Sequence, residues 1–230
     1  MNEPELRLGA PVDATPAQRP GPVTLEGRYG RVERLASAHA ASLWEAVRGH
    51  DAIWTHMSQY GPFADARAFA DWIETRIAFD DPYSYAVVDP AGRAFGIATL
   101  MEIRLAMRVI EVGHIVYSPA LQRTPLGTEA QYLLARYAIE TLGYRRYEWK
   151  CNALNVASRR AALRYGFTFE GILRQNMIAK GRNRDTAYYS ILDGEWPRVR
   201  AAFEAWLAPQ NFDPEGNQRR RLEDIRATPG

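Results

Sequence analysis

The sequence contains very little cysteine and no long apolar run. Its 230 residues include one cysteine, Cys151, which excludes an internal disulfide and fits a reducing compartment. No stretch of about 18 consecutive apolar residues occurs, so no transmembrane helix is expected. The N-terminus is acidic and rich in proline, whereas a secretory signal begins with a basic segment and continues with an apolar one. We therefore expect a cytoplasmic protein that does not bind membranes.

The signatures of several enzyme classes are also absent. His39, His50 and His56 do not cluster with acidic residues or cysteine at the spacing of metal ligands, so no metal is expected. The sequence has no Gly-x-Ser-x-Gly elbow, no Walker loop and no dinucleotide-binding fingerprint. Any catalytic chemistry must therefore be carried by other residues.

No strong excess of charge of either sign is present. The chain has 29 Lys and Arg against 27 Asp and Glu, which gives a net charge of +2. A nucleic-acid-binding protein that uses Arg182, Arg184 and the run Arg219–Arg221 is one rival interpretation, and it predicts binding that weakens steeply with salt. The near-neutral net charge argues against it, and we expect no nucleic-acid partner.

The composition is that of an ordinary globular domain. Hydrophobic residues make up 47% of the chain and charged residues 24%. The length allows one sizeable α/β core with terminal appendages. Residues 1–22, which include five prolines, are expected to form a flexible arm, residues 23–207 one domain, and residues 208–230 a polar, mobile tail.

Hydrophobic periodicity predicts the order of the elements. Strands are expected at 24–35, 83–88, 95–103, 109–118, 145–151, 167–178 and 184–192. Helices are expected at 37–48, 66–79, 129–142, 152–165 and 195–207. Ser37 and Asp65 are the predicted caps of the first two helices. Because part of this order is purely antiparallel and part contains β–α–β steps, we expect an α/β (α+β) fold with a mixed, mostly antiparallel central sheet flanked by helices.

One stretch, 109–142, organises the rest of the chain. Ile110, Val112 and Val116 alternate as in a strand, Pro119 ends it, and a short polar loop leads into an amphipathic helix. A strand that feeds a helix through a short loop directs free backbone N–H groups and the positive helix end at one point. Such a point binds anions, most often phosphate. The alternative is an ordinary helix start.

The loop in this stretch resembles a known cofactor loop. Its sequence, Gln-Arg-Thr-Pro-Leu-Gly-Thr over residues 122–128, is similar to the acetyl-CoA pyrophosphate loop of the GNAT superfamily of N-acetyltransferases, whose pattern is Gln/Arg-x-x-Gly-x-Gly/Ala. Gln122 and Gly127 match the pattern. Pro125 stands where the family has its first glycine, so one backbone N–H is missing there.

A second motif supports the same resemblance. Asn155 and Ser158 follow a short strand, and Gly166-Phe167 and Glu170-Gly171 come later in the chain. This order resembles the Asn-x-x-Ser, Gly-Phe and Glu-Gly signature of the ribosomal-protein-type (RimL-like) branch of the family. The resemblance covers roughly residues 22–207.

The resemblance implies a specific fold and a site for acetyl-CoA. In this fold the central strand carries a bulge, expected here near Gly113 and His114, and it splays from the strand at 145–151. The pantetheine arm of acetyl-CoA would lie in the gap along Ile115, Val116 and Tyr117. Asn155 would bond the pantetheine arm, and Ser158 would lie near the sulfur. The pyrophosphate would rest on Gln122, Arg123, Thr124, Leu126, Gly127 and Thr128.

The implied reaction is transfer of an acetyl group to a primary amine by direct attack in a ternary complex. A backbone N–H near the bulge, that of Val116, is expected to stabilise the oxyanion. Many relatives protonate the leaving sulfur with a tyrosine four residues before the glycine of Gly-Phe, but Ala162 occupies that position here. Ser158 is therefore the predicted donor, and the alternative is that it only caps the helix.

Glu111 and His114 are the candidate bases. Both lie on the central strand close to the expected thioester, and His114 has an unperturbed pKa of about 6.5. Simple alternation places them on opposite faces, although a bulge changes the phase. Positioning of the substrate also supplies rate, so a dedicated base is not obligatory.

Two matters stay open at this point. The amine acceptor is a small molecule or a protein N-terminus, and the choice between a monomer and a homodimer is not decided. A non-catalytic module that senses acyl-CoA is the alternative function, because a loop glycine and the catalytic tyrosine are both replaced. Release of free thiol with a panel of amines separates the enzyme from the sensor.

Overall fold

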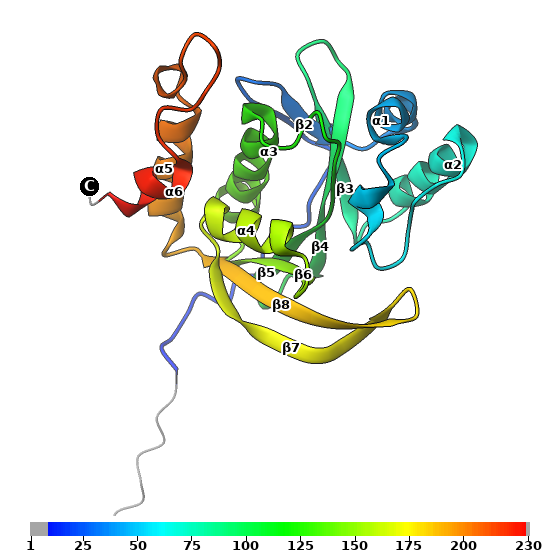
Figure 1. Cartoon of the computed structure of the whole chain (residues 1–230). Helices are drawn as coiled ribbons and strands as arrows, with labels where there is room; N and C mark the ends of the chain where they lie inside the picture. The colour runs from blue at the N-terminus through cyan, green and yellow to red at the C-terminus, as the bar shows by residue number, and fades with distance from the viewer. Residues whose placement is uncertain (1–8, 229–230) are drawn as a thin grey trace, which may run out of the picture.

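A computed structural model describes residues 9–228, and it contains one large sheet flanked by helices (Figure 1). The sheet has eight strands in the order β1-β2-β3-β4-β5-β6-β8-β7. Among these strands only β5 and β6 pair in parallel. The strands are β1 Thr24–Glu26, β2 Arg31–Arg34, β3 Tyr83–Val88, β4 Ala94–Arg104, β5 Val109–Tyr117, β6 Arg146–Asn152, β7 Thr168–Ala179 and β8 Arg182–Leu192. The predicted mixed, mostly antiparallel sheet is confirmed.

Helices cover both faces of the sheet (Figure 1). On one face, α1 (Ala40–Val47) and α2 (Ala66–Ile77) form a core with β3, β4 and β5. On the other face, α3 (Pro125–Arg136), α4 (Val156–Tyr165) and α5 (Trp196–Leu207) enclose a larger core. The short helix α6 (Leu222–Ala227) packs against α5 and α4. Short helical turns complete the chain: η1 Ser37–His39, η2 Asp51–Trp54, η3 Tyr137–Thr141 and η4 Pro209–Asn211.

The helix starts follow the predicted capping in one case and depart from it in another. Asp65 caps α2, since its Oδ1 accepts a hydrogen bond of 2.8 Å from Ala68 N–H. Ser37 does not cap a helix, because it lies inside the 3₁₀ turn η1, and α1 begins only at Ala40. There the His39 ring accepts a bond from Ala36 N–H, which satisfies the local backbone in another way.

Parts of both terminal segments pack against the rest of the chain. Ala17 is 7% exposed, and the backbone of residues 17 and 18 donates hydrogen bonds to Leu105 and Leu142. In the tail, Leu222 is completely buried, and Arg226 donates to the last carbonyls of α4. Both segments therefore contribute residues to the larger core, while the flexible arm at 1–22 and the mobile tail at 208–230 stay predictions. Residues 1–8, also assigned to the arm, lie outside the described residues, and the domain boundaries stay a prediction.

The central strand β5 bends and separates from its parallel neighbour. Thr99 of β4 pairs with Gly113 and Ile97 with Val116, so His114 and Ile115 together oppose Ala98. This is a bulge, and His114 adopts φ 46° within it. Pairing between β5 and β6 ends at Glu111 and Glu148. The predicted bulge and splayed strands are confirmed.

Candidate active site

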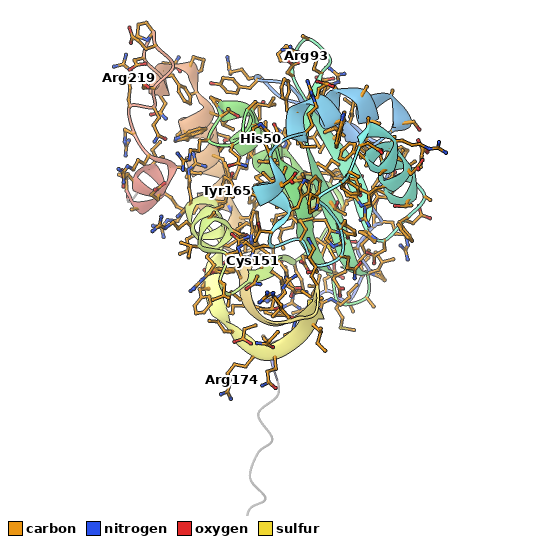
Figure 2. The ribbon with its side chains drawn as sticks, turned by 45° about the vertical axis from the view of Figure 1, so that its right-hand side comes forward. His50, Arg93, Cys151, Tyr165, Arg174 and Arg219 are labelled. Carbon is orange, nitrogen blue, oxygen red and sulfur yellow. The ribbon has the colours of Figure 1, made fainter. Side chains whose placement is uncertain are left out.

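A cleft of about 740 Å³ opens where β5 and β6 separate. Its lining combines the bulge, the end of β6, the start of α4, the end of α2, the segment after η2, and the inner face of the β7–β8 hairpin. Figure 2 shows Cys151 inside the molecule, while Arg174 projects outward from the hairpin. Of the predicted site residues, the cleft brings together Glu111, His114, Ile115, Asn155 and Ser158. It does not include Val116, Tyr117 or the loop at 122–128.

The register of β5 decides which backbone groups face the gap. Ser118 N–H donates to Phe95 O in the neighbouring strand β4. Because strand groups alternate, Val116 also turns its N–H toward β4, and its carbonyl lies beside Gly96. Ile115 and Tyr117 then face the side on which β6 has moved away. The Val116 N–H, expected to face the gap, is therefore directed away from it.

The loop after β5 forms a capped helix start. Thr124 Oγ1 accepts a 3.0 Å bond from Gly127 N–H, and Pro125 occupies the first helical position, where its missing N–H costs no internal bond. The N–H groups of Arg123 and Leu126 have no hydrogen-bond partner within residues 9–228. The loop therefore offers two free donors at a positive helix end, fewer than the family pattern would supply.

Three further side chains of the predicted site support this loop. Gln122 Nε2 donates to Tyr117 O at 2.9 Å, and the Tyr117 hydroxyl donates to Gly127 O at 3.1 Å. Thr128 is 2% exposed, and its hydroxyl accepts a bond from Arg164 of α4. These hydrogen bonds hold the shape of the loop from the side of the core, and the loop backbone faces outward.

The start of α4 places Asn155 and Ser158 at the cleft. Asn155 Oδ1 caps the helix by accepting Ser158 N–H at 3.0 Å, which leaves the Asn155 amide N–H₂ free. Ser158 Oγ accepts a 3.0 Å bond from Trp149 Nε1. Since indole only donates, the Ser158 hydroxyl keeps its own proton available for another acceptor. Trp149 was not predicted as a site residue.

Glu111 is a buried carboxylate at the point where the strands part. It is 6% exposed and lies 2.9 Å from Lys150 Nζ, which also contacts Glu148 at 3.1 Å. Burial raises the pKa of Glu111 to about 7, although Lys150 acts in the opposite direction. A carboxylate with this pKa can take up a proton near neutral pH.

His114 is held in the neutral state. Burial, together with the nearby charges of Arg76 and Arg184, lowers its pKa to about 4. Arg76 Nη2 lies 3.2 Å from His114 Nδ1, and the Tyr60 hydroxyl lies 3.1 Å from Nε2. The bulge brings His114 to the same cleft as Glu111, so the alternation rule does not hold here. Of the two candidate bases, Glu111 has the more suitable pKa.

The side of the cleft formed by α2, the segment after η2 and the β7–β8 hairpin contains residues that were not predicted from the sequence. Arg76 lies on the otherwise apolar face of α2 formed by Phe69, Trp72 and Ile73, which is the signal that could have revealed it. Lys180 Nζ donates to Trp54 O and Gly61 O, at 3.1 and 2.8 Å. Through these bonds and that of Arg184 to Ser58, the hairpin tip at 180–184 contacts η2 and the segment that follows it.

Neither a membrane-spanning helix nor a metal-binding cluster is found in the described part of the chain. No helix in residues 9–228 has the length and apolar character needed to cross a membrane. Within the same residues, no group of three or more His, Cys, Asp or Glu side chains could hold a metal ion.

Comparison with known proteins places the fold. The model of the acetyltransferase (GNAT) domain matches residues 31–168. A GCN5-related N-acetyltransferase from Brucella melitensis is 44% identical, with a TM-score of 0.90 over 93% of this chain and 98% of its own. A structure described as a probable acetyltransferase of the GNAT family, from Chromobacterium violaceum, is 41% identical, with a TM-score of 0.78 over 85% of this chain and 100% of its own.

More distant structures share the fold alone. RimL, described as a ribosomal L7/L12 alpha-N-protein acetyltransferase, is 19% identical, with a TM-score of 0.63 over 74% of this chain and 94% of its own. No curated protein matches the sequence. The matched domain and the two relatives above 40% identity are sufficient to assign the family: the chain belongs to the GNAT acetyltransferases.

Proposed function

We propose that the protein is an acetyl-CoA-dependent N-acetyltransferase that acetylates a primary amine by direct attack in a ternary complex. The observation that carries this proposal is the gap between β5 and β6, which ends at a buried carboxylate of suitable pKa. Backbone N–H and C=O groups of β5 face the gap and can bond an extended cosubstrate, and Glu111 lies at the inner end of the gap. The cleft beyond it has room for an acceptor.

Acetyl-CoA would be held by backbone groups more than by side chains. The groups of Ile115 and Tyr117 that face the gap suit the amides of pantetheine, and the free amide of Asn155 suits a pantetheine carbonyl. The pyrophosphate would meet the N–H groups of Arg123 and Leu126 at the start of α3. The remaining predicted contacts, Gln122, Thr124, Gly127 and Thr128, support the loop.

Glu111 would accept the proton of the attacking amine, directly or through water. Its carboxylate form grows as pH rises through about 7, which is the range in which the proton must be removed. His114, neutral and already bonded to Arg76, would position the acceptor. The N–H of Ile115 is the proposed donor to the oxyanion of the tetrahedral intermediate.

The leaving thiolate needs a proton at the other side of the reacting carbon. The bond that breaks is the C–S bond of the thioester, and the sulfur takes a proton as it leaves. The Ser158 hydroxyl is the proposed donor, since the indole of Trp149 fixes its oxygen from behind. Ser158 then takes a proton from solvent, and Glu111 releases to solvent the proton that it took from the amine.

The finer placement within the family is also a proposal. The Asn155 and Ser158 motif supports a RimL-like branch, whose named member acts on a protein N-terminus. A cytoplasmic location is supported by the single buried cysteine, Cys151.

The direct test is acetyl-CoA turnover with a broad amine panel, read by release of free thiol. The expected result is thiol release with at least one amine, with equal formation of the acetylated product. Binding of acetyl-CoA without release across the whole panel would contradict the enzyme and favour the acyl-CoA sensor.

A further inference from the structure

One arginine in the cleft is buried without a carboxylate partner. Arg76 lies in the last turn of α2 and is 5% exposed. Its recorded neighbours are His114 Nδ1 and the rings of Tyr60 and Phe79, with the guanidinium carbon 5.4 and 5.7 Å from the ring centres. No carboxylate in residues 9–228 forms an ion pair with it. Burial lowers the pKa of Arg76, and the nearby charge of Arg34 lowers it as well, while Tyr60 acts in the opposite direction.

A second arginine reaches the same part of the cleft. Arg184 of β8 donates to Ser58 Oγ, while its Nε–H is buried and has no partner within the described chain. Both arginines line the cleft together with His114 of the bulge, whose pKa they lower. We call Arg76, Arg184, Tyr60 and His114 the basic corner.

The acidic groups of the cleft do not balance the basic corner. Glu111 is paired with Lys150, and Glu102 is exposed on β4, where Arg76 does not contact it. The end of α2 supplies only partial negative charge to Arg76. A buried guanidinium in this state is stabilised when an anion with two oxygens binds it, because its donors form a planar fork.

We infer that the amine acceptor carries a carboxylate, which binds at the basic corner while the amine faces Glu111. Arg76 and His114 touch, and Glu111 lies three residues before His114 on the same strand. Since Glu111, Arg76 and His114 line the same cleft, a single acceptor of the amino-acid class would place its amine and its carboxylate there together. This inference rests on the proposed function and narrows its substrate.

The test compares matched sets of acceptors: L-amino acids, their α-amides, and the amines that lack the carboxyl group. Taurine and phosphoethanolamine distinguish a carboxylate from other anions. For the acid acceptors, Arg76→Met is expected to reduce kcat/KM by about 100-fold, mainly through KM, because one partner of a buried charge pair is removed. The kcat/KM values for the amides should change little. For each acceptor, the ratio of kcat/KM in the variant to that in the wild type cancels differences in amine basicity.

Two controls separate recognition from folding. Arg67→Met removes an exposed arginine from the same helix and should leave all values unchanged. Arg76→Lys keeps the charge but not the fork, and should recover part of the loss. Equal losses for acids and amides in Arg76→Met, or wild-type preference for the amides, would overturn the inference. Preference for taurine or phosphoethanolamine over every amino acid would also overturn the carboxylate assignment.

A binding measurement keeps this inference distinct from the proposed function. If no amine releases thiol, the enzyme proposal fails, and the basic corner is tested with the same compounds by thermal shift and tryptophan fluorescence. Amino acids, but not their amides, should then bind wild type and fail to bind Arg76→Met. Absence of this difference would contradict the carboxylate site itself.

Discussion

The two walls of the cleft differ in how their buried charges are compensated. On the cosubstrate wall, formed by β5, β6 and the starts of α3 and α4, Glu111 is paired with Lys150 and each helix start is capped by a side chain. On the acceptor wall, formed by α2, residues 55–65 and the β7–β8 hairpin, Arg76 is buried without a counter-ion.

The difference shows which wall is complete before a ligand binds. Paired charges and capped helix ends are satisfied within the protein, so the cosubstrate wall presents mainly backbone groups to a ligand. An uncompensated buried cation is costly unless another group completes its hydrogen bonds. The acceptor wall is therefore the part of the site where a ligand must supply the missing counter-ion and hydrogen-bond acceptors.

The largest effect on kcat is expected at Glu111, which lies where the two walls of the cleft meet. Glu111→Gln should lower kcat by about 100- to 1,000-fold, because general base catalysis contributes roughly 10²–10⁴-fold. In the wild type, log kcat/KM should rise with pH and level off above about 7, since the carboxylate form of Glu111 is the active one. The variant should lose this rise. Steady-state thiol release across pH measures both quantities.

Glu148→Gln is the matched control for this prediction. Glu148 lies opposite Glu111 in the backbone register of β5 and β6, and its carboxylate also contacts Lys150. It does not line the cleft. The Glu148→Gln variant should lower the melting temperature and move the midpoint of the pH profile to lower pH, because the charge of Glu148 raises the pKa of Glu111, while turnover on the plateau stays near that of the wild type. A Glu111 variant with wild-type turnover and an unchanged pH profile would remove Glu111 as the base.

A smaller effect is expected at the leaving group. Ser158→Ala should lower kcat by about 30- to 100-fold, near the low end of proton-transfer contributions, and leave the Kd of CoA unchanged. Trp149→Phe keeps the ring but removes the donor to Ser158, and should lower kcat less. Calorimetry with CoA and thiol release separate binding from turnover. Full activity in Ser158→Ala would leave the hydroxyl with no role in the reaction.

Asn155 allows its two functions to be separated. Asn155→Asp keeps the oxygen that caps α4 but loses the amide donor, so the Kd of CoA should rise about tenfold at constant stability. Asn155→Ala loses the cap as well, which costs about 1 kcal/mol. For a chain of this size, that loss corresponds to a drop in Tm of roughly 2–4 °C. Equal CoA affinity in the Asn155→Asp variant and the wild type would show that the amide makes no contact.

The smallest effect concerns the phosphate loop. Pro125→Ala restores the backbone N–H that the family pattern has, so the Kd of CoA should fall about 3- to 10-fold, as one added hydrogen bond implies. Stability should fall by up to about 1 kcal/mol, because proline restricts the unfolded chain. Tighter binding together with lower stability would identify the missing N–H as the cause. Unchanged or weaker binding would mean that the loop does not use this position.

Local patterns in the sequence predicted the elements that form the cosubstrate wall, while its contacts with the cosubstrate stay a prediction. The alternation in β5, the loop before α3 and the cap at Asn155 are each written in a few consecutive residues, and the bulge near His114 followed from the family resemblance. The direction of the Val116 N–H was not predictable, because it depends on the register between β4 and β5. Local motifs thus indicated which elements form this wall, but not which backbone N–H groups of β5 face the gap.

Long-range contacts built the acceptor wall, and the sequence did not predict them. Arg76 contacts His114, 38 residues away, and Lys180 bonds Gly61 across 119 residues. The pKa values of Glu111 and His114 moved in opposite directions from their usual values because of burial and neighbours from other elements. An arginine on the apolar face of a predicted helix was the one local sign of this wall.

A crystal structure with CoA bound tests the central claim most directly. The account predicts that the pantetheine arm lies between β5 and α4, against Ile115, Tyr117 and Asn155, with the pyrophosphate at the N–H groups of Arg123 and Leu126. A structure in which CoA occupies another surface, while the gap beyond Glu111 and Glu148 stays closed by side chains, would contradict it.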